Sequence, residues 1–472
     1  MRKLIICLFF VSIPFLAKGG EIEEDLKYWS QWYPYAIGPV SVEQARLAII
    51  NWSGRQNLEI SLSEVRNWNE PEVGRMPAYG LKPTGSILPP EIRTWYAFDV
   101  EDPNPDHKYT GTVWVDSWTG EVKGLHKNYG HYTPEGAIGD MLLPQQSENI
   151  ARQIVNSYFP NIPVSSMEAE FYPKLKNGTW EEFSHIVCIT FYTRFTNPQG
   201  EKVSVDVQSA KVWLDSRSGE LAEIFACYEP LEVSPFHSLS YEELARAAAS
   251  YLYGLGAEEV IIRGVGPYDA YRNISHQDVY IEEDMTVWRL SREEPYGQQR
   301  LWTWIDFNIK SPDFPNLEQS WTGGVDGHTG EVIYACYAPT ICGGIIPPKR
   351  EKSEDSFNLY FNGMKRKPKI QPLIKEGKVY IGIEDLKAIG FNIAKKGKGY
   401  LLSFKDKKVM IDGKDILKEG KVLYLNGEAL RRGKGIVVHY NKGKKAFHIL
   451  VLNDKAYEKG LEARKKLKIS KG

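Results

Sequence analysis

A short pattern that recurs three times in the chain constrains its fold more than any other feature. Each copy has an apolar residue, Asp, two variable residues, Ser or Thr, Gly, Glu and a second apolar residue. Its aspartates are Asp116, Asp215 and Asp326, at spacings of 99 and 111 residues. Three copies of one pattern at such spacings indicate tandem homologous modules.

The chemistry of the pattern predicts a tight connection between two β-strands. An Asp side chain accepts backbone N–H groups two residues on, and Gly adopts the positive φ that closes a short turn. The Asp and Glu could instead form a catalytic carboxylate pair. Because turn chemistry accounts for the Asp and solvent exposure for the Glu, we interpret the pattern as structural. The predicted hairpin residues are Asp116, Gly120, Asp215, Gly219, Asp326 and Gly330.

A helix-like segment precedes each copy, and strand-like runs lie between helix and hairpin. The helical segments are Ser41 to Ile50, Ser147 to Tyr158 and Ser240 to Tyr253. The strand-like runs are Thr94 to Val100, Ile186 to Phe195 and Leu301 to Ile309. Each helical segment begins with a Ser suited to cap it, and Glu243 completes a capping box with Ser240. A helix followed by an antiparallel sheet places each module in the α+β class.

Residues 1–19 have the features of a secretory signal peptide. A basic start precedes the mostly apolar run Leu4–Ala17, and small residues precede the predicted cleavage before Gly20. The run is shorter than the roughly 20 residues that cross a bilayer and contains Pro14, so a membrane anchor is the less favoured alternative. We expect an exported chain that does not span the membrane after cleavage and is secreted or associated with a bacterial cell wall.

Tandem modules behind such a signal resemble the bacterial YcdB/YcdC-repeat proteins. The order of helix and strands, ending in hairpins such as Val325–Val332, resembles the PepSY type of domain over about Val40 to Tyr337. The resemblance implies three PepSY/cystatin-like units that are extracytoplasmic and non-catalytic. Domains of this type accompany secreted peptidases and are thought to bind or restrain them. This chain departs from the simplest form by long insertions such as Asn51 to Arg93, in which we expect any binding specificity to reside.

Four cysteines remain after removal of the leader. In an oxidising compartment they allow three pairings, of which Cys188 with Cys227 would staple one module and Cys336 with Cys342 would close a short loop. Four buried thiols are an equally good interpretation. The sequence has no Cys-x-x-Cys pair and no His at zinc-ligand spacing from a Cys, so we expect no metal and no cofactor.

The formal net charge of -1 hides two regions of opposite sign. Residues 345–472 contain 32 Lys and Arg against 14 Asp and Glu, whereas residues 1–344 contain 27 against 46. Short alternating runs between Val379 and Leu452 predict a small β-rich domain behind a Pro-containing linker. The run Lys378–Gly390 resembles the start of the copper-amine-oxidase N-terminal-like (stalk) domain, although Gly and Glu stand where that family often has Pro and Arg. The resemblance implies no copper and no oxidase chemistry.

Lysine clusters make this basic region a candidate binding surface. For an exported bacterial protein the available polyanions are teichoic-type wall polymers and anionic lipids, so the charge predicts attraction to an anionic cell-wall polymer. Sparse aromatic interleaving and export argue against nucleic acid. The alternative is that the lysines only solvate a small β domain and protect its edge strands. The candidate binding residues are Lys395, Lys396, Lys398, Lys442, Lys444 and Lys445.

No established catalytic motif occurs in the sequence. We find no H-E-x-x-H, G-x-S-x-G, P-loop or G-x-G-x-x-G opening a helix, and the nine histidines are scattered. Asp102, Asn104 and Asp106 have the first spacing of an EF-hand loop. However, His107 replaces the required Gly and Val113 stands at the position of the bidentate Glu, so calcium is not expected.

These observations predict an α+β chain of three helix-plus-antiparallel-sheet units and a β-rich C-terminal domain. The predicted segments are a signal peptide (1–19), units at 20–140, 141–236 and 237–344, a linker (345–369), a stalk-like domain (370–455) and a basic tail (456–472). The favoured function is a non-catalytic binding protein that engages a protein partner, such as a secreted peptidase, while its basic domain holds it at the envelope. An envelope hydrolase with a site assembled between units and a purely structural surface protein stay open as alternatives.

Overall fold

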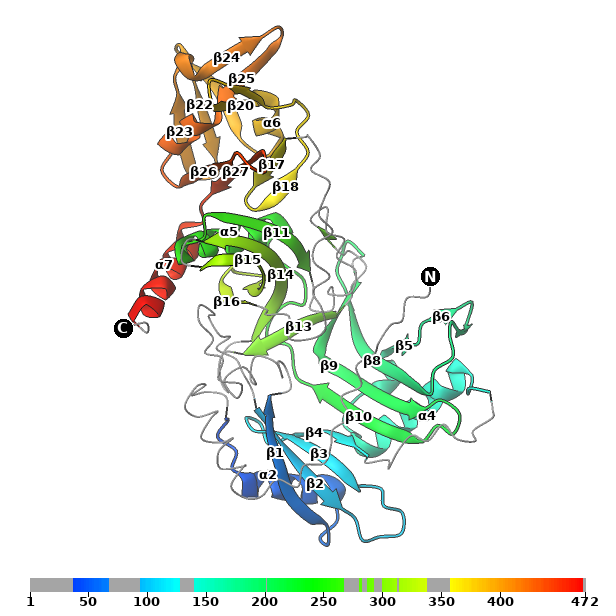
Figure 1. The fold of residues 1–472 in the computed structure, drawn as a ribbon. Helices are drawn as coiled ribbons and strands as arrows, with labels where there is room; N and C mark the ends of the chain where they lie inside the picture. The colour runs from blue at the N-terminus through cyan, green and yellow to red at the C-terminus, as the bar shows by residue number, and fades with distance from the viewer. Residues whose placement is uncertain are drawn as a thin grey trace. The chain divides into compact units, whose positions relative to one another are not determined.

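The computed structural model describes most of the chain downstream of the predicted signal peptide. The described residues are 37–67, 94–127, 140–200, 202–266, 280–281, 287–292, 299–311, 314–337 and 357–469. They form two compact units, the first within Met1–Gly74, Glu91–Phe191 and Ala210–Cys227 and the second within Arg75–Pro90, Tyr192–Ser209 and Tyr228–Gly472. The protein is of the mixed α+β kind, with strands more abundant than helices (Figure 1).

In the first unit, the helix α2 (Val42–Ser53) forms where the sequence predicts it. Ser41 Oγ accepts the N–H of Gln44 at 3.2 Å, and Gln44 Oε1 accepts the N–H of Ser41 at 2.8 Å, which completes a capping box. The helix ends at Gly54, whose φ of 67° is left-handed. Ala45 and Ile49 are fully buried, on the side of the helix that contacts the following strands.

Four antiparallel strands follow α2, and we refer to them as the first strand set. They are β1 (Glu59–Asn67), β2 (Thr94–Glu101), β3 (Gly111–Asp116) and β4 (Val122–His126), each paired with the next. The predicted strand Thr94–Val100 is β2. Phe98 of β2 and Val113 and Val115 of β3 are fully buried, so the centre of this sheet supplies its core.

A second helix and strand set repeat the order. After α4 (Pro144–Tyr158) the strands β5 (Glu168–Tyr172), β8 (Ile186–Thr196), β9 (Lys202–Asp215) and β10 (Leu221–Tyr228) pair in sequence order. The 3-10 helix η2 (Val164–Ser166) precedes β5, and a hairpin of β6 (Leu175–Lys176) and β7 (Thr179–Trp180) follows it. The helix begins before the predicted Ser147, because Pro144 occupies its first turn, where a missing N–H costs nothing.

The first and second strand sets join through their last strands, β4 and β10, which pair antiparallel. The paired residues are Gly124 with Phe225, Leu125 with Ile224 and His126 with Glu223. On one face of the junction Trp95 stacks on Phe225, with 4.9 Å between the ring centroids. Trp114 and Ala97 are buried in the same cluster, so both backbone pairing and aromatic packing hold the junction.

The second unit contains a third helix and strand set. The helix α5 (Tyr241–Leu255) starts with the predicted capping box of Ser240 and Glu243. Its strands are β11 (Glu259–Gly266), β14 (Gln299–Ser311), β15 (Phe314–Asp326) and β16 (Val332–Tyr337), which pair antiparallel in this order. The short β12 (Tyr280–Ile281) lies parallel to β11, and β13 (Val287–Arg292) pairs with β14.

The basic C-terminal region is β-rich, as its alternating pattern predicts, and folds as three small sheets around one core. One sheet holds β17 (Asn358–Phe361), β18 (Met364–Arg366), β26 (Ile436–Asn441) and β27 (Ala446–Val451). A second holds β19 (Leu373–Lys375), β20 (Lys378–Gly382), β24 (Ile416–Glu419) and β25 (Val422–Asn426), and a third holds β21 (Asn392–Lys396), β22 (Gly399–Phe404) and β23 (Lys407–Ile411). The remaining elements are α6 (Ile383–Ala388), η4 (Gly413–Asp415) and η5 (Gly427–Arg432). Strand β17 lies within the segment predicted as a linker, because it pairs with the distant β27.

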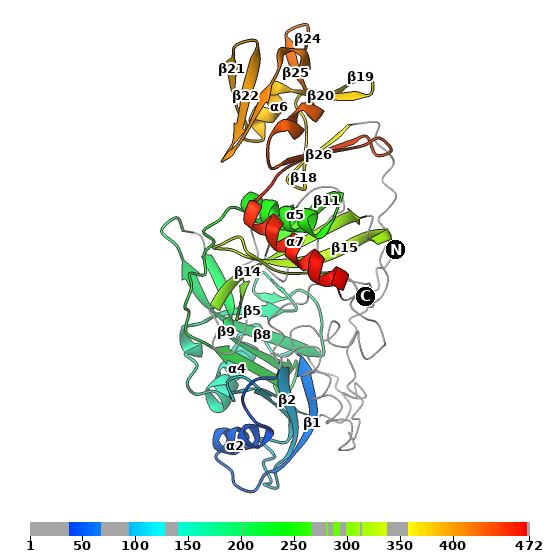
Figure 2. The same cartoon turned by 90° about the vertical axis from the view of Figure 1, so that its left-hand side faces the viewer.

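The last element of the described residues is the helix α7 (Asp454–Ile469), which covers most of the predicted basic tail. Figure 2 shows α7 lying along α5, and the two helices contact each other. The core formed by α5, β11 and β14 also contains Met364, Leu450, Leu452 and Ala456. The C-terminal domain and the third strand set therefore share one hydrophobic core.

Candidate functional site

The three predicted turns have the same hydrogen bonds, and each joins the last two strands of a strand set. The Oδ1 atom of each Asp accepts the N–H groups of the residues two and three positions further along the chain. The distances are 2.7 and 3.3 Å for Asp116, 3.0 and 2.8 Å for Asp215, and 2.8 and 3.2 Å for Asp326. The glycines have left-handed φ angles of 74° (Gly120), 73° (Gly219) and 69° (Gly330). The carboxylates are thus engaged by the backbone of their own turns.

The Glu that follows each turn has a different environment in the third copy from that in the first two. Glu220 is exposed, and Glu121 is exposed except for an ion pair with Lys123. Glu331 is only half-buried but accepts Arg300 Nη1 at 3.0 Å and Lys459 Nζ at 2.8 Å. Burial raises its pKa, yet the hydrogen bond and charge of Lys459 outweigh that effect and lower the pKa overall. The expectation that solvent exposure explains this Glu is therefore wrong for the third copy, where it ties β16 to α7.

The acidic loop considered for calcium is neutralised by an arginine. Arg55 Nη1 lies 3.2 Å from Asp102 Oδ1, and Arg55 Nη2 lies 2.7 Å from Asp106 Oδ2. Asp102 is fully buried, so the guanidinium supplies the positive charge that a buried carboxylate needs. Among the described residues, no group of three or more His, Cys, Asp or Glu side chains is placed to hold a metal ion.

The six candidate lysines are all exposed, but they lie on two different sheets of the C-terminal domain. Lys395 and Lys396 end β21, and Lys398 lies in the turn to β22. The other three, Lys442, Lys444 and Lys445, lie in the turn between β26 and β27. The sequence treats them as one surface, whereas the structure separates them into two groups.

Lysines of the first group line an open hollow of about 530 Å³, which we call the lysine hollow. Its lining residues are Lys396, Lys398, Gly399, Met410, Ile411, Asp412, Gly413 and Lys414. Two glycines allow the backbone to converge there: a Cβ on Gly399 would lie 2.1 Å from the carbonyl oxygen of Ile411, and one on Gly413 would lie 2.6 Å from that of Lys398. The hollow depends on residues without side chains at both positions.

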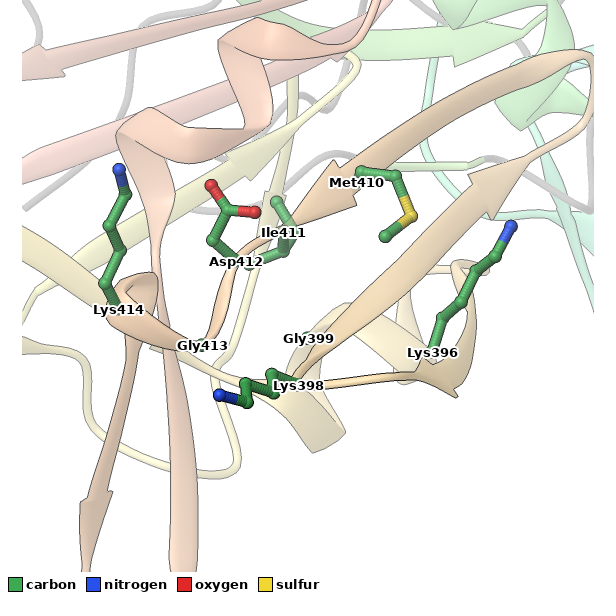
Figure 3. Close-up of a pocket in the computed structure, with 8 residues that line it drawn as sticks. All are labelled: Lys396, Lys398, Gly399, Met410, Ile411, Asp412, Gly413 and Lys414. Carbon is green, nitrogen blue, oxygen red and sulfur yellow. The ribbon is translucent and has the colours of Figure 1, made fainter.

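Figure 3 shows how the charges of the lysine hollow are arranged. The ammonium groups of Lys396, Lys398 and Lys414 stand apart around the hollow, and the carboxylate of Asp412 lies between Lys414 and Met410 in this view. Met410 lies beside Lys396 and is 44% exposed, which adds an apolar side chain to the rim. Separate ammonium groups suit an extended anion better than a single compact one.

The lysines of the hollow differ from neighbouring lysines in their ion pairing. Lys405 pairs with Glu243 of α5, and Lys407 pairs with Asp454 at 2.5 Å. Lys396, Lys398 and Lys414 form no ion pair with any residue in the described part of the chain. Their charge is therefore available to a ligand.

Sequence reasoning did not select Lys414 or Met410. Lys414 lies outside the lysine clusters of the sequence, and Met410 falls within the alternating runs that predict a β-rich domain. The β22–β23 hairpin brings both next to Lys396 and Lys398. A search for lysines that flank predicted hairpin ends would have found Lys414.

A buried polar cluster joins β11 to the sheet of β26 and β27. Asn441 Nδ2 donates to Glu259 Oε1 at 2.5 Å, and His439 Nε2 lies 3.3 Å from the same oxygen. Burial opposes ionisation of Glu259, but its hydrogen bonds from His439 and Asn441 outweigh this and lower its pKa to about 2. Next to it, burial lowers the pKa of His448 to about 4. His448 stacks on Tyr360 at 4.6 Å, and its Nε2 meets no hydrogen-bond partner in the described residues.

The cysteines that the structure describes favour the thiol interpretation for one of the two candidate pairs. Cys188 and Cys227 are not joined in a disulfide. Cys188 is buried, and burial raises the pKa of its thiol to about 11. Cys342 lies outside the described residues, so the pairing of Cys336 with it stays a prediction.

No helix in the described ranges combines the length and apolar character needed to cross a membrane.

Comparisons with known proteins give few matches. No protein-family model matches the chain, and no curated protein matches it. A solved structure with weak similarity is the Bacillus megaterium YpeB C-terminal domain, at 9% sequence identity and a TM-score of 0.24. The match covers 64% of this chain and 99% of that one.

Proposed function

We propose that this protein is a non-catalytic binding protein of the bacterial cell envelope, which binds an anionic wall polymer through its C-terminal domain and a protein partner through three PepSY-like units. The observation that carries the proposal is the lysine hollow. Three exposed ammonium groups without ion pairs in the described residues stand around this hollow, whose lining also includes Met410 and Asp412, on a region with a large excess of positive charge.

The arrangement of the ammonium groups favours a polymer with repeated negative charges. The ammonium groups of Lys396, Lys398 and Lys414 stand apart, so one small anion would meet one of them at a time. A phosphodiester chain of the teichoic type would present successive phosphates to successive lysines. Lysine binds phosphate as a point charge without a fixed geometry, which suits a flexible, repetitive ligand.

The proposed protein-binding part consists of the three units of helix and strand set. Their shared turn chemistry and strand order support common descent of α2–β4, α4–β10 and α5–β16. The resemblance to PepSY-type domains suggests a secreted peptidase as the partner. Export, on which this role depends, rests on the predicted signal peptide.

The test uses the full chain, because the C-terminal domain shares a core with the third strand set and is not shown to fold alone. Retention on isolated teichoic-type polymer is measured across a salt series. We expect retention to fall as salt rises, because screening shortens from about 10 Å at 0.1 M to about 3 Å at 1 M. A triple variant with Lys396→Ala, Lys398→Ala and Lys414→Ala should lose most retention at low salt.

A second triple variant removes the same charge elsewhere on the domain. Lys418→Ala, Lys421→Ala and Lys434→Ala replace three exposed lysines outside the hollow and should retain most binding. Equal losses in the two triple variants would show that only net charge attracts the polymer. No retention of the unmodified chain at low salt would contradict the proposal.

A further inference from the structure

The junction of the first two strand sets has local two-fold symmetry. Leu125 and Ile224 lie at equivalent positions, each nine residues after the Asp of its own turn, and they pair with each other across β4 and β10. Gly124 and Glu223 are each eight residues after the Asp of their turn, and His126 and Phe225 are each ten residues after it. Gly124 pairs with Phe225 and His126 pairs with Glu223, so the position eight residues on in one strand always faces the position ten residues on in the other. Equivalent surfaces that pair with each other form an isologous interface, the type found in two-fold dimers.

The third strand set presents the same strand in the same register. Strand β16 pairs with β15 as β4 pairs with β3: Ala335 faces Gly323 where Leu125 faces Val113. Each pairing also has one register shift at the same place, between Gly324 and Val325 in β15 and between Trp114 and Val115 in β3. Ala335 is therefore the counterpart of Leu125 and Ile224.

Unlike β4 and β10, β16 pairs on one side only within the described residues. Its sequence, Val-Ile-Tyr-Ala-Cys-Tyr, has no charged residue and no proline. Charged residues and proline usually protect an edge strand from pairing with another chain. The edge strand β1 carries Glu59 and Glu64, and the edge strand β5 carries Glu168 and Glu170. The contact of Lys459 Nζ with the carbonyl of Val332, at 2.7 Å, lies at the start of β16, ahead of the counterpart positions. An edge without such protection is a template on which another strand can pair.

We propose that β16 pairs antiparallel with β16 of a second copy of this chain, with the two-fold axis at Ala335, and so forms a homodimer. The pairing repeats the β4–β10 junction between molecules. Tyr334 of each copy then faces Cys336 of the other, an aromatic residue opposite a small one, as Phe225 faces Gly124. No like charges meet, which is the usual obstacle to joining identical strands.

The direction of the backbone groups provides a specific test. Lys127 donates its N–H to the carbonyl of Ala222 in the strand next to β4, at 2.9 Å. Because N–H groups alternate in direction along a strand, Leu125 also directs its N–H toward that strand. By the shared register, the N–H of Ala335 points away from β15, toward the open edge. Ala335→Pro removes this donor and leaves the β15–β16 hydrogen bonds in place.

We expect the full chain to sediment at twice the mass of one chain and Ala335→Pro to sediment as a monomer with an unchanged far-ultraviolet circular dichroism spectrum. A wild-type monomer at every concentration measured would overturn the proposal. So would a dimer that Ala335→Pro leaves intact, because another surface would then hold it.

Cross-linking provides an independent readout if Ala335→Pro fails to fold. Directly opposite residues in a hydrogen-bonded antiparallel pair have Cα atoms about 5.5 Å apart, within disulfide range. Ala335→Cys should therefore form a disulfide-linked dimer under mild oxidation. Tyr337→Cys is the matched control, since its two copies would lie about 13 Å apart along the paired strands. Equal cross-linking of Ala335→Cys, Tyr337→Cys and the unmodified chain would contradict the assigned register.

Discussion

Gly254 of α5 and Gly460 of α7 face each other so closely that neither position has room for a side chain. A Cβ on Gly254 would lie 2.2 Å from the carbonyl oxygen of Tyr457, and one on Gly460 would lie 2.1 Å from that of Tyr251. Both clashes are with backbone, which cannot rotate away. The two glycines therefore set the distance at which the last helix packs on the third strand set's helix.

Gly460→Ala should destabilise the second unit, although Ala is the better helix former. Helix propensity alone predicts a gain of up to about 1 kcal/mol. The backbone clash should reverse the sign and cost about 1–3 kcal/mol, the usual range for overpacking. Denaturant unfolding measures the change, with Lys455→Ala on the exposed side of α7 as the control, expected within about 0.5 kcal/mol of the parent. A more stable Gly460→Ala chain would mean that α7 does not pack as described.

Arg246 should be the strongest polar contributor to the contact between α5 and the C-terminal domain. Its Nε donates to the carbonyl of Val451 and its Nη2 to that of Leu452, both at 2.6 Å, and the side chain is buried. Arg246→Met keeps the apolar stem but leaves two buried carbonyls without their donor. At about 1–3 kcal/mol for each unsatisfied group, we expect a loss of several kcal/mol in the free energy of unfolding. A loss below about 1 kcal/mol would show that water replaces the guanidinium.

The stability of the second unit should fall in mild acid because of His448. Its pKa is about 4 in the folded chain and about 6.5 in the unfolded chain, so the unfolded chain binds the proton more readily. The stabilisation is complete above pH 6.5 and is lost as the pH falls toward 4, by about 3 kcal/mol in total. Glu259 acts at lower pH, since its contribution is present above pH 4.5 and disappears toward pH 2.

The variant His448→Phe isolates this effect. A phenyl ring can still stack on Tyr360, but it cannot bind a proton. Unfolding free energies measured between pH 4 and pH 7 should fall with acidity in the unmodified chain and much less in His448→Phe. Parallel curves for the two proteins would assign the pH dependence to other groups.

The turn aspartates should matter for stability and not for binding. Asp215 accepts the N–H groups of Arg217 and Ser218, and these bonds outweigh burial and lower its pKa. Asp215→Ala should cost about 1–2 kcal/mol, whereas Asp215→Asn keeps an acceptor and should cost less. Polymer retention should be unchanged in both variants once they are measured at a temperature where they are folded. A loss of retention in the fully folded Asp215→Asn would contradict the structural interpretation of the turn.

Local signals account for what the sequence predicted well. The caps at Ser41 and Ser240 and the turns at Asp116, Asp215 and Asp326 depend on residues within four positions of each other, and they form as the pattern indicates. Strands such as β2, β8 and β14 were also located, because their apolar runs are long. In the candidate site, three of the lysines that line or adjoin the hollow, at 395, 396 and 398, were found from their clustering in sequence.

Long-range pairing accounts for what the sequence did not predict. The residues from Asn358 to Arg366 resemble a linker in composition but form β17 and β18, because Asn358 to Phe361 pair with Ala446 to Ile449. Most of the segment predicted as a basic tail forms α7. The role of Gly460 in that helix becomes visible only once its close contact with α5 is known. Lys414 joins the hollow because β22 and β23 pair and bring it next to Lys396 and Lys398.

The amino-acid sequence by itself determined the α+β composition, the repeated turns, the helix caps and the excess of lysine near the C-terminus, since each depends on neighbours along the chain. The tertiary structure alone decided which lysines surround one hollow, which glycines let α5 and α7 meet, and which strand edges are paired. Those properties arise from contacts between residues that are distant in sequence, 18 residues apart for Lys396 and Lys414 and 206 apart for Gly254 and Gly460. The free energy of such contacts depends on shape and burial that no local pattern encodes.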